Sequence, residues 1–157
     1  MAGENMRLVP ATAELVELDL AGAELLADRL EVDLPADWPP EFHGERVLRH
    51  TLDRLLEPGS AGWWLHYFVS IDGDRPELIG TGGLKGPPVD GLVEIGYSVV
   101  PSAQRRGYAT EACAGLIASA RERGAKVVRA ETLPERIASG GCLRSSASTR
   151  LPRRRPA

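Results

Sequence analysis

The feature that most constrains the fold is the segment 94–111, which reads EIGYSVVPSAQRRGYATE. Its first half has the β-branched and aromatic character of a strand, and its second half begins a helix. The turn between them, residues 104–109, opens directly onto a helix N-terminus, where unpaired N–H groups and a partial positive charge favour an anion such as phosphate. Gly107 lets the chain bend and lets a ligand approach the backbone. Arg105 and Arg106 add positive charge beside the turn.

This motif resembles a known family. The residues Q-R-R-G-Y-A, preceded by E-I-G-Y-S-V and followed by T-E-A, fill every fixed position of the pattern Q/R-x-x-G-x-G/A. That pattern is similar to the acetyl-CoA pyrophosphate loop of the GNAT superfamily of N-acetyltransferases. The resemblance extends from Met6 to Ser139, nearest to the branch with the ribosomal-protein N-terminal acetyltransferases. The alternative interpretation is an ordinary strand–turn–helix connection with a surface arginine pair.

The resemblance implies an α/β fold with a mixed, mostly antiparallel central sheet flanked by helices, and the sequence patterns agree. Segments rich in β-branched, aromatic or apolar residues predict strands at 7–10, 63–71, 78–84, 92–100 and 125–132. Apolar residues at helical spacing predict helices at 13–30, 40–56 and 107–124. Gly22 is expected to weaken or break the first helix, and the glycines of 78–84 predict either a bulge or a close approach of another backbone.

The resemblance also implies how acetyl-CoA, the co-substrate, binds. The turn would hold the pyrophosphate, and the pantetheine arm would lie along the backbone of 96–100 like an added strand. A backbone N–H of 97–99 would polarise the thioester carbonyl. Nothing in the sequence calls for a metal. The expected cofactor-binding residues are Tyr97, Ser98, Val99, Gln104, Arg105, Arg106, Gly107, Tyr108, Ala109 and Thr110.

Glu94 is the candidate general base, directly or through water, because the family often carries a carboxylate near that point. Strand alternation places it on one face with Gly96 and Ser98. The alternative is that Glu94 is a solvated or structurally bonded strand residue.

In the family the first two helices lie over the acceptor groove, so Trp38, Phe42 and His43 are expected to line a substrate pocket. Core or lid packing is the alternative for these side chains.

The resemblance stops after Ser139. Arg136 stands where relatives carry a cofactor-contacting asparagine, and residues 140–157 contain five arginines but no acidic or aromatic residue. We expect residues 1–139 to form one acetyltransferase domain that lacks its C-terminal strands, followed by a basic, disordered tail. The tail arises either from an altered reading frame or as a genuine basic extension.

Composition sets the remaining expectations. The chain has 157 residues, 43% of them hydrophobic, with no long apolar run and no signal peptide, so we expect a cytoplasmic protein without a membrane partner. Residues 1–139 contain 14 basic and 22 acidic residues, a net charge of −8. This charge would attract a cationic substrate, and the alternative is an acidic surface that serves solubility.

Three functions follow. The first is an N-acetyltransferase that moves an acetyl group from acetyl-CoA to a primary amine, either a protein N-terminus or a small molecule. The second is a catalytically impaired remnant of such an enzyme with weak or no CoA binding. The third, least expected, is an RNA-associated protein that acts through its arginine-rich tail. The sequence identifies neither the acceptor amine nor a general acid, and it leaves a homodimer open.

Overall fold

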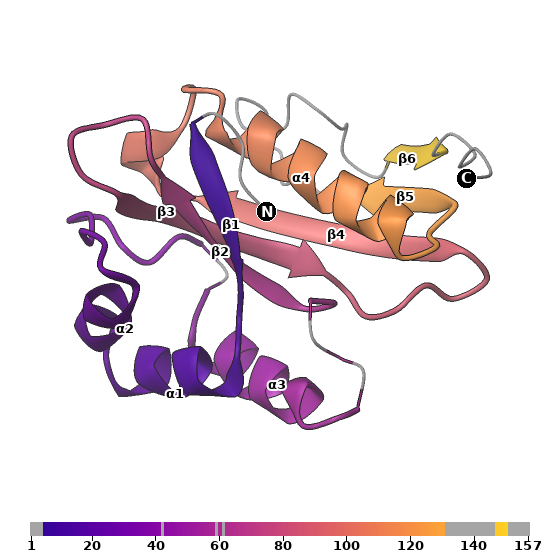
Figure 1. Cartoon of the computed structure of the whole chain (residues 1–157), viewed down its shortest axis with the longest axis horizontal. Helices are drawn as coiled ribbons and strands as arrows, with labels where there is room; N and C mark the ends of the chain where they lie inside the picture. Colours follow the sequence, from indigo (N-terminus) through magenta and orange to yellow (C-terminus); the bar gives the residue numbers. More distant parts are fainter. Residues whose placement is uncertain (1–4, 42, 59, 61, 131–146, 151–157) are drawn as a thin grey trace.

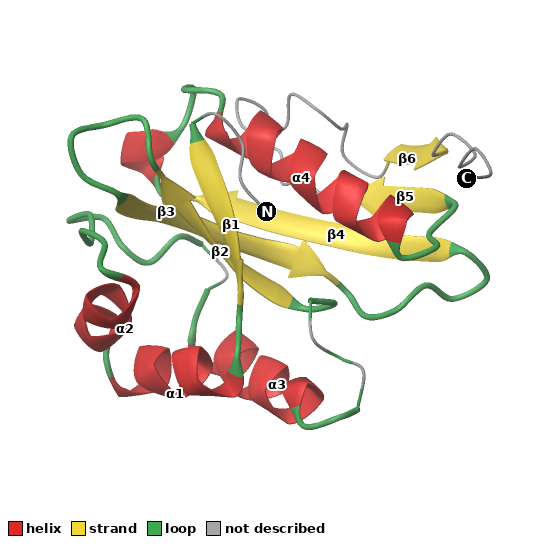
Figure 2. Ribbon diagram, viewed as in Figure 1, coloured by secondary structure: helices red, strands yellow, loops and turns green. Residues whose placement is uncertain are grey.

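A computed structural model describes residues 5–41, 43–58, 60, 62–130 and 147–150. Over these residues the chain forms a six-stranded sheet in the order β1-β2-β3-β4-β5-β6, with helices on both faces (Figures 1 and 2). The strands are β1 (Met6–Pro10), β2 (Leu65–Ser70), β3 (Glu77–Leu84), β4 (Leu92–Val99), β5 (Val127–Ala130) and β6 (Ala147–Arg150). The helices are α1 (Ala13–Ala21), α2 (Ala23–Leu30), α3 (Glu45–Leu55) and α4 (Tyr108–Glu122), with a short 3-10 turn, η1 (Pro101–Ala103).

The sheet is mixed and mostly antiparallel, as predicted. Only β4 and β5 run parallel, and α4 connects them. The remaining neighbours pair antiparallel. The predicted bulge is present where the register of β2 with β3 shifts between Phe68 and Val69.

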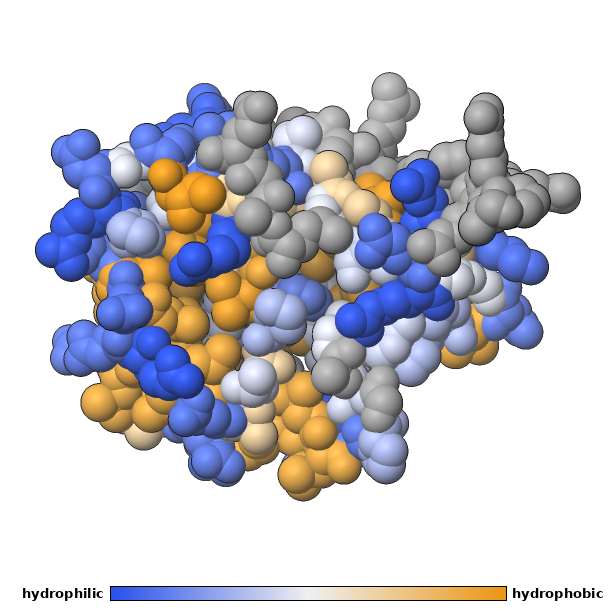
Figure 3. Space-filling model, in the orientation of Figure 1, coloured by the Kyte–Doolittle hydropathy of each residue, from blue (hydrophilic) through white to orange (hydrophobic). Residues whose placement is uncertain are grey.

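The helical prediction is confirmed at Gly22 and wrong at the start of α3. Gly22 does separate α1 from α2, as expected. The third helix begins at Glu45, however, and not near Pro40, because the extended backbone of Gly44 forms its N-cap. Within α3, only Leu48 and Thr51 are buried. Figure 3 shows apolar side chains at the surface in the lower part of the view, where Figure 1 places α1 and α3.

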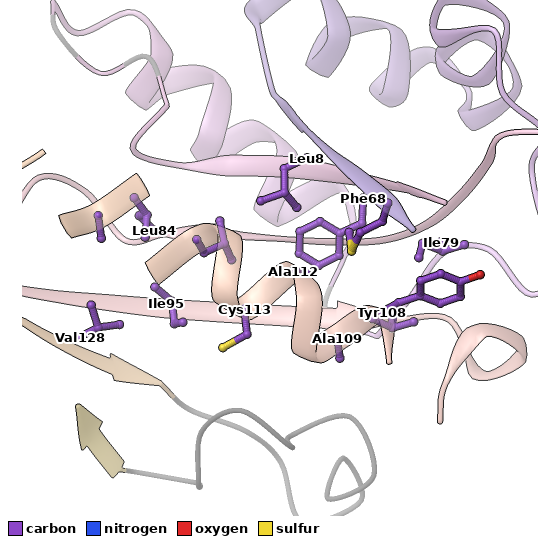
Figure 4. Packing of buried hydrophobic residues seen from close by; sticks show 14 of the residues in the cluster. Leu8, Phe68, Ile79, Leu84, Ile95, Tyr108, Ala109, Ala112, Cys113 and Val128 are labelled. Carbon is purple, nitrogen blue, oxygen red and sulfur yellow. The ribbon is translucent and has the colours of Figure 1, made fainter. Parts of the chain in front are cut away.

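The sheet has one apolar cluster on each face. On one face, α4 packs its small residues Ala112 and Cys113 and the larger Leu116 against the sheet, in contact with Phe68 and Ile95 (Figure 4). On the other face, the helices α1, α2 and α3 cover a second cluster (Figure 1), with Tyr67, Val69 and Leu78 from the strands and with the residues Val16, Leu26 and Leu48 from the helices. Helix α4 and the helices α1–α3 therefore lie on opposite sides of the central strands.

Within the segment expected to be a structureless tail, four residues form strand β6 (Ala147–Arg150). The backbone of β6 pairs antiparallel with β5, from Val127↔Arg150 to Ala130↔Ala147. Backbone pairing at the edge of a sheet does not require alternating apolar side chains. The sequence of β6 therefore gives only a weak strand signal. The rest of the predicted tail, and Arg136, lie outside the described residues.

None of the helices in the described part of the chain has the length and hydropathy that a membrane span needs.

Candidate functional site

The turn between β4 and α4 leaves the helix N-terminus open. Gly107 precedes the helix with φ 84°, and no side chain caps the helix there. The first helical bond is the one from Glu111 N–H to the Gly107 carbonyl, at 3.0 Å, so the amides of Tyr108, Ala109 and Thr110 precede the helical ladder. A Cβ placed on Gly107 would meet nothing within 4 Å. An anion can therefore reach these backbone amides directly.

A hollow of about 20 Å³ lies at this turn, which is room for about one water-sized group. Its lining comprises Val99, Ala103, Gln104, Arg105, Gly107, Ala109 and Thr110. Most of the predicted loop residues are thus brought together. Gln104 uses its side-chain amide to donate to the Val99 carbonyl, at 2.9 Å, so this amide fixes the loop to the end of β4.

The side chains of Arg105 and Arg106 lie at two different hollows. Arg105 lines the hollow at the helix terminus, with φ 63°. The Arg106 guanidinium instead lies 5.1 Å from the ring centre of Tyr108, and both residues line a different hollow of about 260 Å³ near the β2–β3 connection. The Tyr108 hydroxyl donates to the Asp72 carboxylate at 2.6 Å. Burial and this hydrogen bond raise the pKa of Tyr108, so its side chain remains a donor that ties α4 to the β2–β3 connection.

Beside the turn, one edge of β4 has no strand partner among the residues that the structure describes. Val100 N–H donates to the Ile79 carbonyl and the Glu94 carbonyl accepts from Lys85 N–H, so alternate residues of β4 bond toward β3. Tyr97 lies between two residues that bond toward β3, so its backbone N–H and C=O point to the other edge of β4. There β5 pairs with β4 only from Leu92 to Ile95. Across the ranges that the structure describes, no strand pairs with Tyr97 at that edge, so an extended ligand can add there.

Tyr97 and Ser98 each bring an unpaired hydroxyl to this end of β4. Both hydroxyl oxygens are buried and have no hydrogen-bond partner among the described residues. The Tyr97 ring packs against the cluster beneath α4, and burial raises the pKa of its hydroxyl. Ser98 pairs with Thr81 and faces the α1–α3 side. The predicted alternation along β4 is confirmed.

Glu94 is held by two cations. One carboxylate oxygen lies 3.8 Å from Lys85 Nζ, and the other lies 3.5 Å from Arg129 Nη1. The parallel register that places Arg129 beside Glu94 is a feature of the β4–β5 pair that the sequence could not reveal. These two contacts support the alternative interpretation, in which Glu94 is a structurally bonded strand residue.

Trp38 packs against both apolar clusters, and its ring meets that of His43 edge-on with centroids 5.5 Å apart. The adjacent Asp37 carboxylate accepts from the Ser102 backbone N–H at 2.7 Å and from its hydroxyl at 2.9 Å. The loop between α2 and α3 is therefore tied to the β4–α4 connection. Phe42, the other predicted pocket residue, lies outside the described residues.

A buried polar network was missed by the sequence analysis. The Asp19 carboxylate accepts from the Tyr67 hydroxyl at 2.9 Å and contacts His43 Nε2 at 2.8 Å. One sequence signal was available: Asp19 lies four residues after Leu15, on the buried side of α1, where a charge needs a partner. Elsewhere, the described residues contain no group of three or more His, Cys, Asp or Glu placed to hold a metal ion.

The sequence matches the family model described as an acetyltransferase (GNAT) domain over residues 6–146. This match spans most of the chain, so the chain belongs to the GNAT acetyltransferase family. It also runs past Ser139, where the sequence analysis ended the resemblance. No curated protein sequence matches the chain significantly.

Solved structures with the same fold include a putative ribosomal-protein-serine acetyltransferase from Vibrio cholerae, which is 17% identical with a TM-score of 0.57 over 90% of this chain and 78% of that one. A Salmonella typhimurium acetyl transferase that modifies the N-terminal serine of ribosomal protein L7/L12 is 15% identical, with a TM-score of 0.55 over 89% and 78%. An aminoglycoside N-acetyltransferase in complex with CoA is 18% identical, with a TM-score of 0.50 over 99% and 97%.

Proposed function

We propose that this chain transfers an acetyl group from acetyl-CoA to a primary amine. One observation carries the proposal: an uncapped helix N-terminus, opened by Gly107, lies beside the end of β4, where no described strand pairs with Tyr97. A phosphate-binding terminus and a strand edge are what a ligand with a pyrophosphate and an amide-containing arm requires. Membership of the family and the CoA complex of a protein with the same fold support this choice of ligand.

Different residues of this chain would bind the pyrophosphate and the amide-containing arm of acetyl-CoA. The amides of Tyr108, Ala109 and Thr110, with the Arg105 guanidinium, would bind the pyrophosphate. The Tyr97 backbone would bind the amide-containing arm, because its N–H and C=O face the open edge. Gly107 leaves the space beside the terminus open, because a Cβ at this position would meet nothing within 4 Å.

Transfer requires a neutral amine and a polarised thioester carbonyl. A backbone N–H of the 97–99 segment would donate to that carbonyl. Glu94 remains a candidate for taking the amine's proton, although its carboxylate is already engaged by Lys85 and Arg129. The acceptor would bind on the α1–α3 side, where Trp38 and the loop tied to Ser102 meet the end of β4.

Two classes of acceptor deserve a direct comparison. Proteins with this fold include an enzyme that modifies a ribosomal-protein N-terminus and an enzyme named for aminoglycosides. We propose that the amine belongs to one of these classes, a peptide N-terminus or a small polyamine, and both can be supplied in one assay.

The test is release of free CoA thiol from acetyl-CoA in the presence of short peptides, an aminoglycoside and simple alkylamines. We expect thiol release that depends on one of these amines, with the acetylated amine identified by mass spectrometry. A Glu94→Gln variant measured in parallel reports the contribution of the carboxylate. Thiol release at the same rate with and without every amine, or no release from a protein that melts cooperatively, would refute the proposal.

A further inference from the structure

The buried network of Asp19, His43 and Tyr67 joins α1, the loop before α3 and strand β2. The side chains of His43 and Asp19 are only 3% and 5% exposed. Asp19 Oδ2 accepts from the Tyr67 hydroxyl, and the same oxygen lies 2.8 Å from His43 Nε2. An ionised carboxylate can only accept, so Nε2 carries the hydrogen in this pair. The neutral ring then holds its lone pair on Nδ1.

That remaining nitrogen has no hydrogen-bond partner although it is buried. The indole Nε1 of Trp38, whose ring meets His43 edge-on, is buried and unpartnered as well. Each such atom costs about 1–3 kcal/mol when it stays unpaired. An acceptor and a donor left unpaired on two touching side chains fit a ligand, or one water, that carries both kinds of group.

The network lies on the face of the sheet that α1–α3 cover, where the proposed function places the acceptor amine. Tyr67 pairs with Thr81, and Thr81 pairs with Ser98, so the three side chains form one row across β2, β3 and β4. Ser98 ends the row with a hydroxyl that is also buried and unpartnered. It directly follows Tyr97, whose backbone faces the open edge.

We propose that His43 is the group that removes the proton from the acceptor amine, directly or through one water, and that Asp19 and Tyr67 position its ring. The inference rests on the acetyl transfer proposed above. In this step an ammonium proton moves to Nδ1, and the nitrogen lone pair forms the bond to the acetyl carbon. The carbon–sulfur bond breaks with its electron pair left on the CoA sulfur. The acylated nitrogen loses its second proton, and the thiolate takes it up through solvent. The positive charge gained by His43 is stabilised by the Asp19 carboxylate.

The surroundings of His43 suit this role better than those of Glu94. Asp19 and Tyr67 are the titratable groups in contact with the imidazole, and Trp38 supplies its other ring neighbour. Burial and the Asp19 carboxylate raise the pKa of Tyr67, so its hydroxyl stays a donor and the carboxylate stays fixed. Glu94, in contrast, has both carboxylate oxygens near cations and a more exposed side chain.

The decisive experiment is the pH dependence of kcat, measured with two acceptors whose amine pKa values differ by about one unit or more. A limb that moves with the acceptor belongs to the amine, and a limb that stays belongs to the protein. We expect one acidic limb that stays at the same pH with both acceptors. His43→Gln should lower kcat by about 100- to 10,000-fold and remove this limb. His50→Gln is the matched control, because His50 lies on the exposed side of α3 against Trp64 and Arg54.

Two further variants separate chemistry from folding. In His43→Ala, added imidazole should restore part of the lost rate, which a purely structural histidine would not allow. Tyr67→Phe keeps the ring but frees Asp19 from one bond, and we expect a lower kcat with an unchanged Kd for acetyl-CoA.

Three results would overturn the inference. The first is a His43→Gln enzyme that keeps the fixed limb and a rate within about tenfold of the wild type, below the range expected of a general base. The second is loss of the fixed limb in Glu94→Gln, which would assign the proton to the carboxylate while acetyl transfer stands. The third is a folded wild-type protein that acetylates no amine, and in that case the proposed function falls with it.

Discussion

Replacing Gly107 with alanine should separate the cost of backbone strain from the loss of a phosphate site. The φ of 84° is unfavourable for any residue with a Cβ, by about 1–2 kcal/mol. For a chain of this length that amounts to about 2–8 °C in Tm. Because the added Cβ meets nothing within 4 Å, no steric clash with the protein adds to this cost.

If the α4 N-terminus binds the pyrophosphate as proposed, the same methyl group would crowd a phosphate oxygen that approaches the amides of Tyr108 and Ala109. A hydrogen bond to a charged group is worth about 1.5–3 kcal/mol, so losing one weakens acetyl-CoA binding by about 10- to 150-fold. Titration calorimetry with acetyl-CoA measures this directly, and thermal unfolding measures the strain.

Gly124 supplies a matched control on the same helix. It lies beyond the C-terminal end of α4 with φ 99°, and a Cβ there also meets nothing within 4 Å. Gly124→Ala should therefore lose similar stability and keep its affinity for acetyl-CoA. If both variants bind acetyl-CoA as the wild type does, or if both lose affinity equally, the assignment of the pyrophosphate to the α4 N-terminus is wrong.

Three further outcomes are expected. Burial lowers the pKa of His66 from 6.5 to about 4, so between these pH values the unfolded chain binds a proton that the folded chain does not. The free energy of unfolding should therefore fall as pH drops from 6.5 to 4. In thermal melts, a His66→Gln variant should show a weaker pH dependence over this range. Thr12→Ala removes the side-chain oxygen that accepts from Leu15 N–H at the start of α1. Chemical denaturation should show a free energy of unfolding lower by about 1 kcal/mol, and an unchanged denaturation midpoint would exclude a capping role. Asp37→Ala removes two bonds to Ser102, and kinetics should show KM for the amine raised by up to about 10-fold with acetyl-CoA affinity unchanged.

The parts of the fold that local sequence determines were predictable. Strand β4, the turn at Gly107 and helix α4 follow from a β-branched run, a glycine that must adopt a positive φ and a stripe of small residues. The break at Gly22 follows from the same kind of local reasoning. The start of α3 was misplaced because Pro40 satisfies the sequence rule for a first helical turn, whereas the extended Gly44 decides where the helix begins.

The parts of the site that depend on distant pairing were not predictable. Asp19 and His43 are 24 positions apart, and Asp19 and Tyr67 are 48 apart, so no spacing rule connects them. The cations beside Glu94 come from the end of β3 and from β5, and only the strand registers bring them together. Arg105 and Arg106 are adjacent in sequence, but the positive φ at Arg105 sends their side chains to different hollows.

The most direct test of the central claim is a thermal melt of the wild-type chain with and without acetyl-CoA. A ligand at about 100 times its Kd adds about 2.7 kcal/mol to the folded state. For a chain of this length we therefore expect Tm to rise by about 5–11 °C. A cooperative melt whose midpoint does not move at millimolar acetyl-CoA would contradict the account, because it would leave a folded protein without a cofactor site at the α4 N-terminus.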